Sequence, residues 1–323
     1  MNTGYAREFG ALTMTGLGSP GGICCLAAQE SPGIVNPMKP ALALGVPAVV
    51  LLTLVLLPPA AAQDAEPSTP ETRPGAEVSF PAGRIVSKSY LSLPDTPGPH
   101  PGVLIAPEWW GHNPYVRMRA DMLSKLGYAA LAMDLYGEGQ VADTPKAAAQ
   151  LDGLLNANQQ EMTARVLAHL KFLAAHPEVD PGKVAAIGYG SGGDVCLQMA
   201  RNGMRGLDGV VAFHPFFRVR PSNPPIRKAT ARVMVCDARE DPYVHLSGGK
   251  VEAFEKEMAS VKTELKIVPF PDAMQSFTVP GADRIGEKFR IPHVYNAKAD
   301  TRAWGLLEAF LRDLWKPVET PSP

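Results

Sequence analysis

The chain has 323 residues, of which 46% are hydrophobic and 20% are charged; this composition is typical of globular proteins and the length permits one large domain or two ordinary ones. Its formal net charge is −1, so no excess of basic residues predicts binding to nucleic acid or to an anionic membrane surface. The sequence shows no repeat of solenoid or propeller length, which argues against those architectures.

The first segment with a clear pattern has the layout of a secretory signal peptide. Lys39 is followed by an apolar stretch at residues 42–57, then by two prolines and a run of alanines ending at Ala62. A short basic end, an apolar middle and small residues at the cleavage site predict that residues 38–62 direct export to the periplasm or the medium. The alternative is a membrane anchor, which requires that the apolar stretch stays uncleaved.

The segments on either side of this signal are interpreted separately. A signal peptide does not ordinarily follow a Gly-rich leader, so we interpret residues 1–37 as the product of a misassigned start, with Met38 as the true start. Residues 63–75 include the stretch EPSTPETRPG and are predicted to form a disordered linker. The folded part is then expected to be one domain over residues 76–323.

Six short apolar runs in this domain are predicted to be strands. Continuous apolar runs of this length suit strands that are covered on both faces, as in a parallel sheet. The runs are Val103–Pro107, Ala129–Leu135, Val184–Tyr189, Gly209–His214, Arg232–Asp237 and Glu264–Phe270.

Helical patterns lie between and after these strands. One has an apolar stripe and three polar residues off it; the stripe is Met162, Val166, Leu170 and Leu173, and the polar residues are Arg165, His169 and Lys171. The other clear patterns are Gly248–Val261 and Asp300–Trp315. Alternating strands and helices predict an α/β fold with a doubly wound, mostly parallel sheet and helices on both faces. A TIM barrel is the other candidate. In the open sheet, functional residues follow the strands directly.

The stretch AIGYGSGGD has the shape of a nucleophile elbow, a tight turn between a strand and a helix. The nucleophile of such a turn stands between two small residues. Here these are Gly188 and Gly192, so the nucleophile position is Gly190, which has no side chain. Ser191 is the alternative nucleophile, although that register places Tyr189 where a small residue is needed; otherwise Ser191 caps the helix.

The segments after the strands resemble, in order, the motifs of the dienelactone hydrolase family of α/β hydrolases. The family reads approximately HEWWGLN, PDLYG, GFCFGG, GADDP, HAFTNP and YNAAADRRSW, where this chain has PEWWGHN, MDLYG, GYGSGG, AREDP, QSFTVP and YNAKADTRAW. The resemblance covers residues 103–315 and implies an α/β-hydrolase fold that acts on esters or lactones. It implies no cofactor and no metal.

The resemblance also implies a catalytic triad of Cys, Asp and His. Carried over position by position, the nucleophile falls on Gly190, the acid on Asp241 and the base on Gln275. Glycine supplies no attacking atom, and a glutamine amide does not titrate, so the side-chain chemistry of two triad positions is absent. The family's oxyanion hole uses the backbone N–H groups at Ser191 and Trp109, which do not depend on side chains.

Glu108 matches the family's glutamate beside the nucleophile, in a pocket expected to include Trp109, Trp110 and Tyr136. Burial would raise its pKa and let it act as an acid or base on its own. The alternative is a structural carboxylate that holds the loop.

Three histidines also follow strands and are candidates to replace the base: His112, His214 and His245. A lone histidine at the end of a strand is more often a structural residue than a base, so the structural interpretation is favoured for each. Their spacing, with or without Glu108, matches no metal-binding motif.

Two of the four cysteines, Cys196 and Cys236, fall in predicted core elements, and Cys24 and Cys25 fall in the leader. In an exported protein Cys196 and Cys236 could form a disulfide, but we expect two buried free thiols.

The sequence therefore favours a divergent, catalytically degenerate member of the family that binds a small ester, lactone or carboxylate. The alternative is an active ester or lactone hydrolase that uses Ser191 or Glu108 with Asp241. A protein-interaction module is a third interpretation, and it requires an exposed apolar patch. Nucleic acid is not an expected partner, and a membrane is one if residues 42–57 are retained.

Overall fold

The computed structural model describes residues 75–221, 228–246 and 248–316. The chain divides into two units, residues 1–64 and 65–323, and every described residue belongs to the second. The predictions for residues 1–37 and 38–62, and nearly all of the predicted linker, lie outside the described residues. Among the residues that are described, no helix combines the length and the apolar character needed to cross a membrane.

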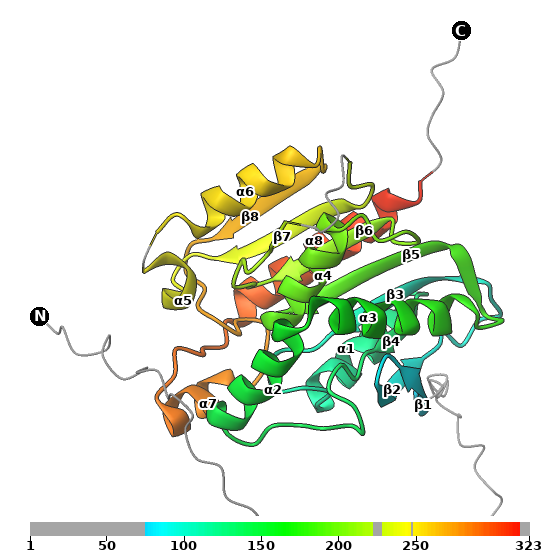
Figure 1. Ribbon diagram of the computed structural model, residues 1–323, viewed down its shortest axis with the longest axis horizontal. Helices are drawn as coiled ribbons and strands as arrows, with labels where there is room; N and C mark the ends of the chain where they lie inside the picture. The colour runs from blue at the N-terminus through cyan, green and yellow to red at the C-terminus, as the bar shows by residue number, and fades with distance from the viewer. Residues whose placement is uncertain (1–74, 222–227, 247, 317–323) are drawn as a thin grey trace, which may run out of the picture. The chain divides into compact units, whose positions relative to one another are not determined.

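An eight-stranded sheet forms the centre of the described part, in the order β1-β2-β4-β3-β5-β6-β7-β8 (Figure 1). The strands β3 to β8 are parallel to one another, whereas β1 pairs antiparallel with β2 and β2 pairs antiparallel with β4. The bounds are β1 Ala76–Ala82, β2 Ile85–Ser92, β3 His100–Ala106, β4 Ala129–Ala132, β5 Val179–Tyr189, β6 Gly209–Phe213, β7 Arg232–Ala238 and β8 Leu265–Phe270. All six predicted strands are confirmed, with shifted ends.

Helices cover both faces of the sheet, as the alternation of strands and helices predicts (Figure 1). One apolar cluster joins the sheet to α2, α3, α4 and α6, and a second joins its opposite face to α1 and α8. The helices are α1 Pro114–Lys125, α2 Pro145–Ala157, α3 Gln159–Ala174, α4 Ser191–Arg201, α5 Pro242–His245, α6 Lys250–Ser260, α7 Ala282–Phe289 and α8 Ala297–Leu314. The predicted α/β-hydrolase architecture is therefore present.

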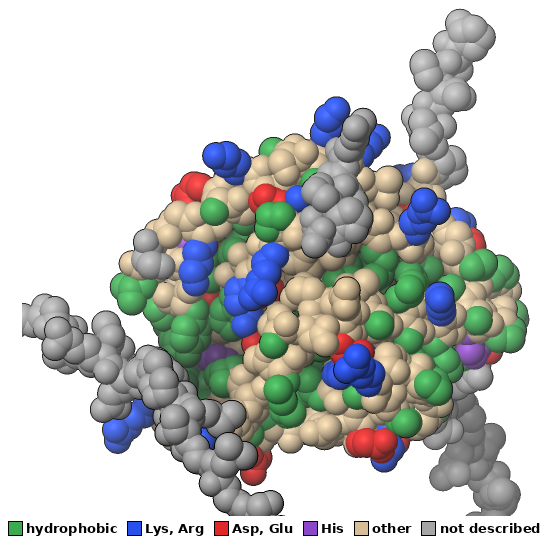
Figure 2. All heavy atoms as spheres, in the orientation of Figure 1, with side chains coloured by type: hydrophobic (Ala, Val, Ile, Leu, Met, Phe, Trp, Pro, Cys, Tyr) green, Lys and Arg blue, Asp and Glu red, His purple; other side chains and the backbone are tan. Residues whose placement is uncertain are grey.

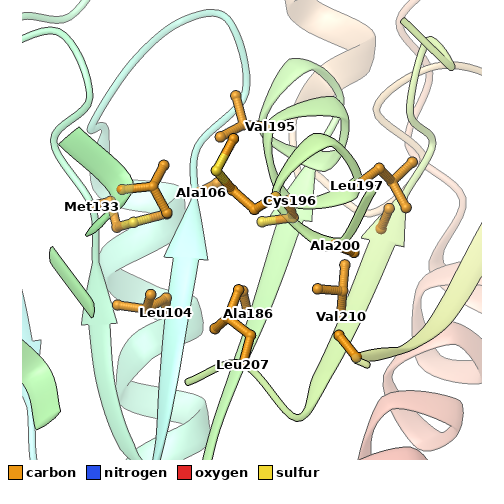
Figure 3. Packing of buried hydrophobic residues seen from close by; sticks show 14 of the residues in the cluster. Leu104, Ala106, Met133, Ala186, Val195, Cys196, Leu197, Ala200, Leu207 and Val210 are labelled. Atoms are coloured by element: carbon orange, nitrogen blue, oxygen red, sulfur yellow. The ribbon is translucent and has the colours of Figure 1, made fainter. Parts of the chain in front are cut away.

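The side chains of β3 show how the strands serve both clusters. Leu104 belongs to the cluster beneath α4, and Val103 and Ile105 belong to the cluster beneath α1 and α8. Figure 3 shows Leu104 beside Ala186 and Val210 from the neighbouring strands β5 and β6, all on the side of the sheet that α4 covers. The sheet is thus apolar on both faces, which leaves its carboxyl edge as the place for polar chemistry.

The antiparallel pair β1–β2 was not predicted, and it corrects the interpretation of His169. This histidine was expected off the apolar stripe of α3, but it is fully buried. Its Nε2 lies 3.0 Å from the hydroxyls of Ser87 and Ser89 on β2, and its Nδ1 lies 2.7 Å from the backbone oxygen of Arg165. The prediction was wrong because α3 packs against the missed pair as well as against the parallel sheet.

The two described cysteines are free and lie in different clusters, Cys196 on α4 and Cys236 on β7. The expectation of two buried thiols is confirmed, and the alternative disulfide is not formed.

The charged side chains of both signs lie scattered over the face seen in Figure 2.

We expect iodoacetamide to leave Cys196 and Cys236 unlabelled in the folded chain and to label both after unfolding. Burial raises the pKa of each thiol to about 12, so the reactive thiolate is scarce. Peptide mapping after labelling measures each position separately. Labelling of either residue under native conditions would contradict this burial, and so would a peptide pair linked through the two sulfurs.

Candidate active site

The elbow between β5 and α4 has the geometry of a nucleophile turn. Gly190 adopts φ 52° and ψ −117°, and its N–H donates to the backbone oxygen of Phe213 at 3.0 Å. A Cβ at Gly188 would lie 2.2 Å from the backbone oxygen of Gly192, and a Cβ at Gly192 would lie 2.3 Å from that of Pro107. The flanking residues must therefore be glycines, because the backbone segments approach too closely for any side chain.

A side chain at Gly190 would point at Gln275, the position that the resemblance assigns to the base. Its Cβ would lie 3.1 Å from the terminal amide group of Gln275 and 3.7 Å from Oε1 of Glu108. The structure thus brings together the nucleophile position, the base position and the pocket glutamate that the sequence predicted. Glycine itself places no side-chain atom at this point of the turn.

Gln275, which the resemblance places at the base position, contacts Asp241 through its amide group. With its amide nitrogen facing the acceptors, Gln275 donates to Asp241 Oδ2 at 2.7 Å and to the backbone oxygen of His214 at 3.1 Å. Both side chains are buried, and Asp241 also accepts from the N–H of Tyr243 at 2.8 Å. Burial raises the pKa of Asp241 to about 7. The amide orients the acid, but it neither takes nor returns a proton at neutral pH.

Glu108 follows β3 and lies buried beneath the elbow. Its Oε1 accepts from the hydroxyl of Ser276 at 2.5 Å and lies 3.9 Å from Nδ1 of His214. Burial raises the pKa of Glu108 from 4.5 to about 7, although the hydrogen bond from Ser276 opposes the shift. A carboxyl group with this pKa can exchange a proton near neutral pH.

Two residues of the site were missed from the sequence, Ser276 and His293. Ser276 follows Gln275 and adopts φ 60°, an uncommon conformation for a residue with a side chain. Its hydroxyl lies 3.0 Å from Nδ1 of His293, which is buried and forms an isolated β-bridge with Gln275. Ser276 could have been identified from the sequence because it directly follows Gln275, the residue at the base position. No local pattern marked His293, because its contact depends on how the chain returns after α7.

The three predicted histidines are dispersed. His214 ends β6, and its Nε2 lies 2.9 Å from the hydroxyl of Thr278, while burial lowers its pKa to about 3. His245 pairs with Asp237, with 3.0 Å between Nε2 and Oδ1.

His112 is buried, and its Nδ1 lies 3.4 Å from Nη2 of Arg117. Burial lowers the pKa of His112 to about 4. Of the three histidines, His214 approaches Glu108. In the part of the chain that the structure describes, no group of three or more His, Cys, Asp or Glu side chains could hold a metal ion.

Tyr136 and Ser191 border a cavity beside Glu108, and Trp109 contacts Tyr136. Tyr136 donates from its hydroxyl to the backbone oxygen of Trp109 at 2.9 Å, and the rings of Trp109 and Trp110 lie 5.1 Å apart. Ser191 is the first residue of α4. It borders this cavity, which is also lined by Glu108 and Tyr136, and the volume of about 10 Å³ gives space for about one water molecule. The first N–H groups of α4 have no acceptor within the helix, so they can bind a ligand oxygen.

The comparison with known sequences agrees with this geometry. The sequence profile of the Dienelactone hydrolase family matches residues 88–314. The chain belongs to the dienelactone hydrolase family. A solved dienelactone hydrolase-like promiscuous phosphotriesterase from metagenomic libraries is 31% identical, with a TM-score of 0.67 over 74% of this chain and 98% of that chain.

Two further relatives are more distant. A Bradyrhizobium protein named "Probable 2-oxo-3-(5-oxofuran-2-ylidene)propanoate lactonase" is 24% identical over 69% of this chain and 88% of its own length. The dienelactone hydrolase of Anabaena variabilis is 18% identical, with a TM-score of 0.51 over 75% of this chain and 98% of that chain, and shares the fold. This dienelactone hydrolase-like chain therefore has the scaffold of an ester and lactone hydrolase.

The raised pKa of Glu108 predicts how the variant Glu108→Gln changes stability with pH. The folded chain keeps a proton on Glu108 that the unfolded chain loses between about pH 4.5 and 7. This contribution is complete below pH 4.5 and is lost as the pH rises through 7. Relative to the native chain, Glu108→Gln is therefore expected to gain about 1–3 kcal/mol of unfolding free energy between pH 4.5 and pH 8.

Urea unfolding of the native chain and of Glu108→Gln, each at pH 4.5 and at pH 8, measures this gain in unfolding free energy. The matched control is Glu240→Gln, which removes an exposed carboxylate and is expected to show no such gain. An equal difference from the native chain at both pH values for Glu108→Gln would show that folding does not raise the pKa of Glu108.

Proposed function

We propose that the chain is a catalytically degenerate member of the dienelactone hydrolase family, which binds a small ester, lactone or carboxylate without forming a covalent intermediate. The observation that carries the proposal is the pair Gly190 and Gln275. The turn, the acid Asp241 and the contacts around them keep the triad arrangement, whereas the attacking atom and the titratable base are missing.

The groups that bind a ligand do not depend on the lost side chains. The backbone N–H groups at the start of α4 offer hydrogen bonds and a positive helix end to a carbonyl or carboxylate oxygen. Tyr136 borders the small cavity beside Glu108, and the rings of Trp109 and Trp110 lie next to that of His293. The lactonase name of the Bradyrhizobium relative supports an ester, lactone or carboxylate as the ligand class.

A second candidate is hydrolysis by a water molecule that Glu108 activates. The position of a Cβ at Gly190 lies 3.7 Å from Glu108 Oε1, and the pKa of this carboxyl group is raised to about 7, as a general base at neutral pH requires. Ser191 is less suited to be the nucleophile, because the amide that replaces the base at Gln275 cannot take its proton.

One experiment separates these candidates. The full chain is incubated with a fluorophosphonate probe and examined by intact-mass spectrometry, and benzoate is titrated while tryptophan fluorescence is followed. We expect no covalent adduct and a saturable change of fluorescence that Trp109→Phe and Trp110→Phe reduce. An adduct on Ser191 would show an active hydrolase with a shifted nucleophile. Turnover of 4-nitrophenyl acetate that Glu108→Gln abolishes, without an adduct, would favour the second candidate.

We also propose that residues 38–62 direct export of the domain to the periplasm or the medium. The basis is the order of basic, apolar and small residues in the sequence. N-terminal sequencing of the secreted protein is expected to begin at Gln63. A membrane-bound chain that retains residues 42–57 would instead show that this apolar stretch is a membrane anchor.

A further inference from the structure

Three buried side chains form a continuous hydrogen-bonded chain beside the triad positions. Glu108 follows β3, Ser276 follows β8, and His293 lies between α7 and α8. The Ser276 hydroxyl lies 2.5 Å from Glu108 Oε1 and 3.0 Å from His293 Nδ1. Each of the three residues is at most 3% exposed. These groups therefore exchange protons with one another more readily than with solvent.

The single hydrogen of the Ser276 hydroxyl couples the two ends of this chain. When Glu108 is ionised, the hydroxyl donates to it, and Nδ1 of His293 must carry a hydrogen in order to donate to Ser276. When Glu108 is neutral, it donates to Ser276, the hydroxyl donates to Nδ1, and the hydrogen of the ring lies on Nε2. The protonation state of Glu108 thus determines the tautomer of His293.

The outer end of the chain lies among aromatic rings. Nε2 of His293 is buried, and within the described residues it has no hydrogen-bond partner. The ring of His293 lies 5.9 Å from that of Trp109, 6.3 Å from that of Trp110 and 6.5 Å from that of Tyr243. Burial lowers the pKa of His293 to about 4, so near pH 7 the ring is neutral and carries one hydrogen, on either Nδ1 or Nε2.

The other titratable groups around the chain do not account for a proton exchange near pH 7. His214 and Tyr115 face Glu108, but burial lowers the pKa of His214 to about 3 and raises that of Tyr115 well above 10. Asp241 has a pKa of about 7, but it contacts Gln275 rather than Ser276. Tyr243 faces His293, and burial raises its pKa above 10.

We propose that His293 exchanges protons with Glu108 through Ser276 and supplies the acid–base capacity that Gln275 lacks. When a hydronium ion of the solvent gives a proton to Nε2 of His293, the proton of Nδ1 passes to the Ser276 oxygen and the original hydroxyl proton passes to Glu108. Ser276 and His293 end with the same number of protons, and Glu108 gains one. The reverse sequence releases it. This proton-relay role goes beyond ligand binding and holds whether a bound ligand is retained or hydrolysed.

Nitrogen-15 NMR of the full chain labelled at histidine tests the relay without any ligand. We expect His293 to change from the Nε2–H tautomer at pH 5.5 to the Nδ1–H tautomer at pH 8.5, with the midpoint of the Glu108 titration. Ser276→Ala and Glu108→Gln should each abolish this change. Asp241→Asn is the matched control, because it removes a second buried carboxyl group outside the chain and should preserve the change.

Three results would overturn the relay: a His293 tautomer that is constant in the native chain, a change that persists in Ser276→Ala, or a change that disappears in Asp241→Asn. Ser276→Ala removes a single oxygen, so it keeps the test decisive if Glu108→Gln does not fold. His169, whose ring nitrogens both have partners in α3 and β2, is the internal reference. Because no ligand is added, failure of the relay is distinguishable from failure of the proposed binding function.

Discussion

The double variant Gly190→Cys/Gln275→His is expected to hydrolyse 4-nitrophenyl acetate about 10²–10³-fold faster than the native chain. A side chain at Gly190 already points at residue 275, which already contacts Asp241. A thiol, an imidazole and an oriented carboxylate would then form a hydrogen-bonded catalytic triad beside the first N–H groups of α4. Initial rates and an acyl adduct in the intact-mass spectrum measure the gain.

Each single variant is expected to stay near the native rate. In Gly190→Cys the Cβ would lie 3.1 Å from the Gln275 amide, and this variant has no base. In Gln275→His there is a base but no nucleophile. Gly190→Ala/Gln275→His is the matched control, because it adds the same Cβ and base without the thiol. If the double variant is folded and as slow as this control, the donors of the oxyanion hole are not in position in this chain.

The largest effect on stability is expected at the elbow itself, where Gly188→Ala should lower the free energy of unfolding by about 3 kcal/mol or more. The added Cβ would lie 2.2 Å from the backbone oxygen of Gly192 and 2.6 Å from the N of Gly193. Both are backbone atoms of α4, so no side-chain rotation relieves the contact. Urea unfolding followed by circular dichroism measures the loss.

Gly305→Ala is the control for this substitution. Gly305 lies on the exposed side of α8, and a Cβ there meets no atom within 4 Å. The same change of one methyl group should therefore stabilise the chain by about 0.5–1 kcal/mol, because glycine is a poor helix former. Equal effects of the two substitutions would show that α4 can move away from β5.

The parallel strands were predictable because each is a short run of apolar residues covered on both faces. The pair β1–β2 was not, because buried positions on both faces of β2 are serines: Ser87 and Ser89 contact His169 on one face, and Ser92 contacts α1 on the other. The same serines explain the error at His169, whose partners lie on that missed strand. A buried polar contact between distant segments leaves no periodic signal in either.

The residues of the candidate site likewise include some that the sequence could predict and one that it could not. Glu108, Gly190, Asp241 and Gln275 each follow a strand directly, so the resemblance and the sheet topology together place them at one edge. His293 follows α7 instead, and it reaches the site through a single β-bridge with Gln275. Its role depends on a tertiary contact that spacing along the chain does not encode.

The pairing of β2 with β4 also bears on where this domain can be cut. The family profile begins at residue 88, inside β2, whereas the sheet begins at Ala76. A chain started at the profile boundary would lack β1 and would expose the remainder of β2 as an unprotected sheet edge, which is a template for aggregation. It would also lose Ser87 and one of the hydrogen-bond partners of the buried His169. We therefore expect a chain that folds to begin before β1, and so to be longer than the segment by which its family is recognised.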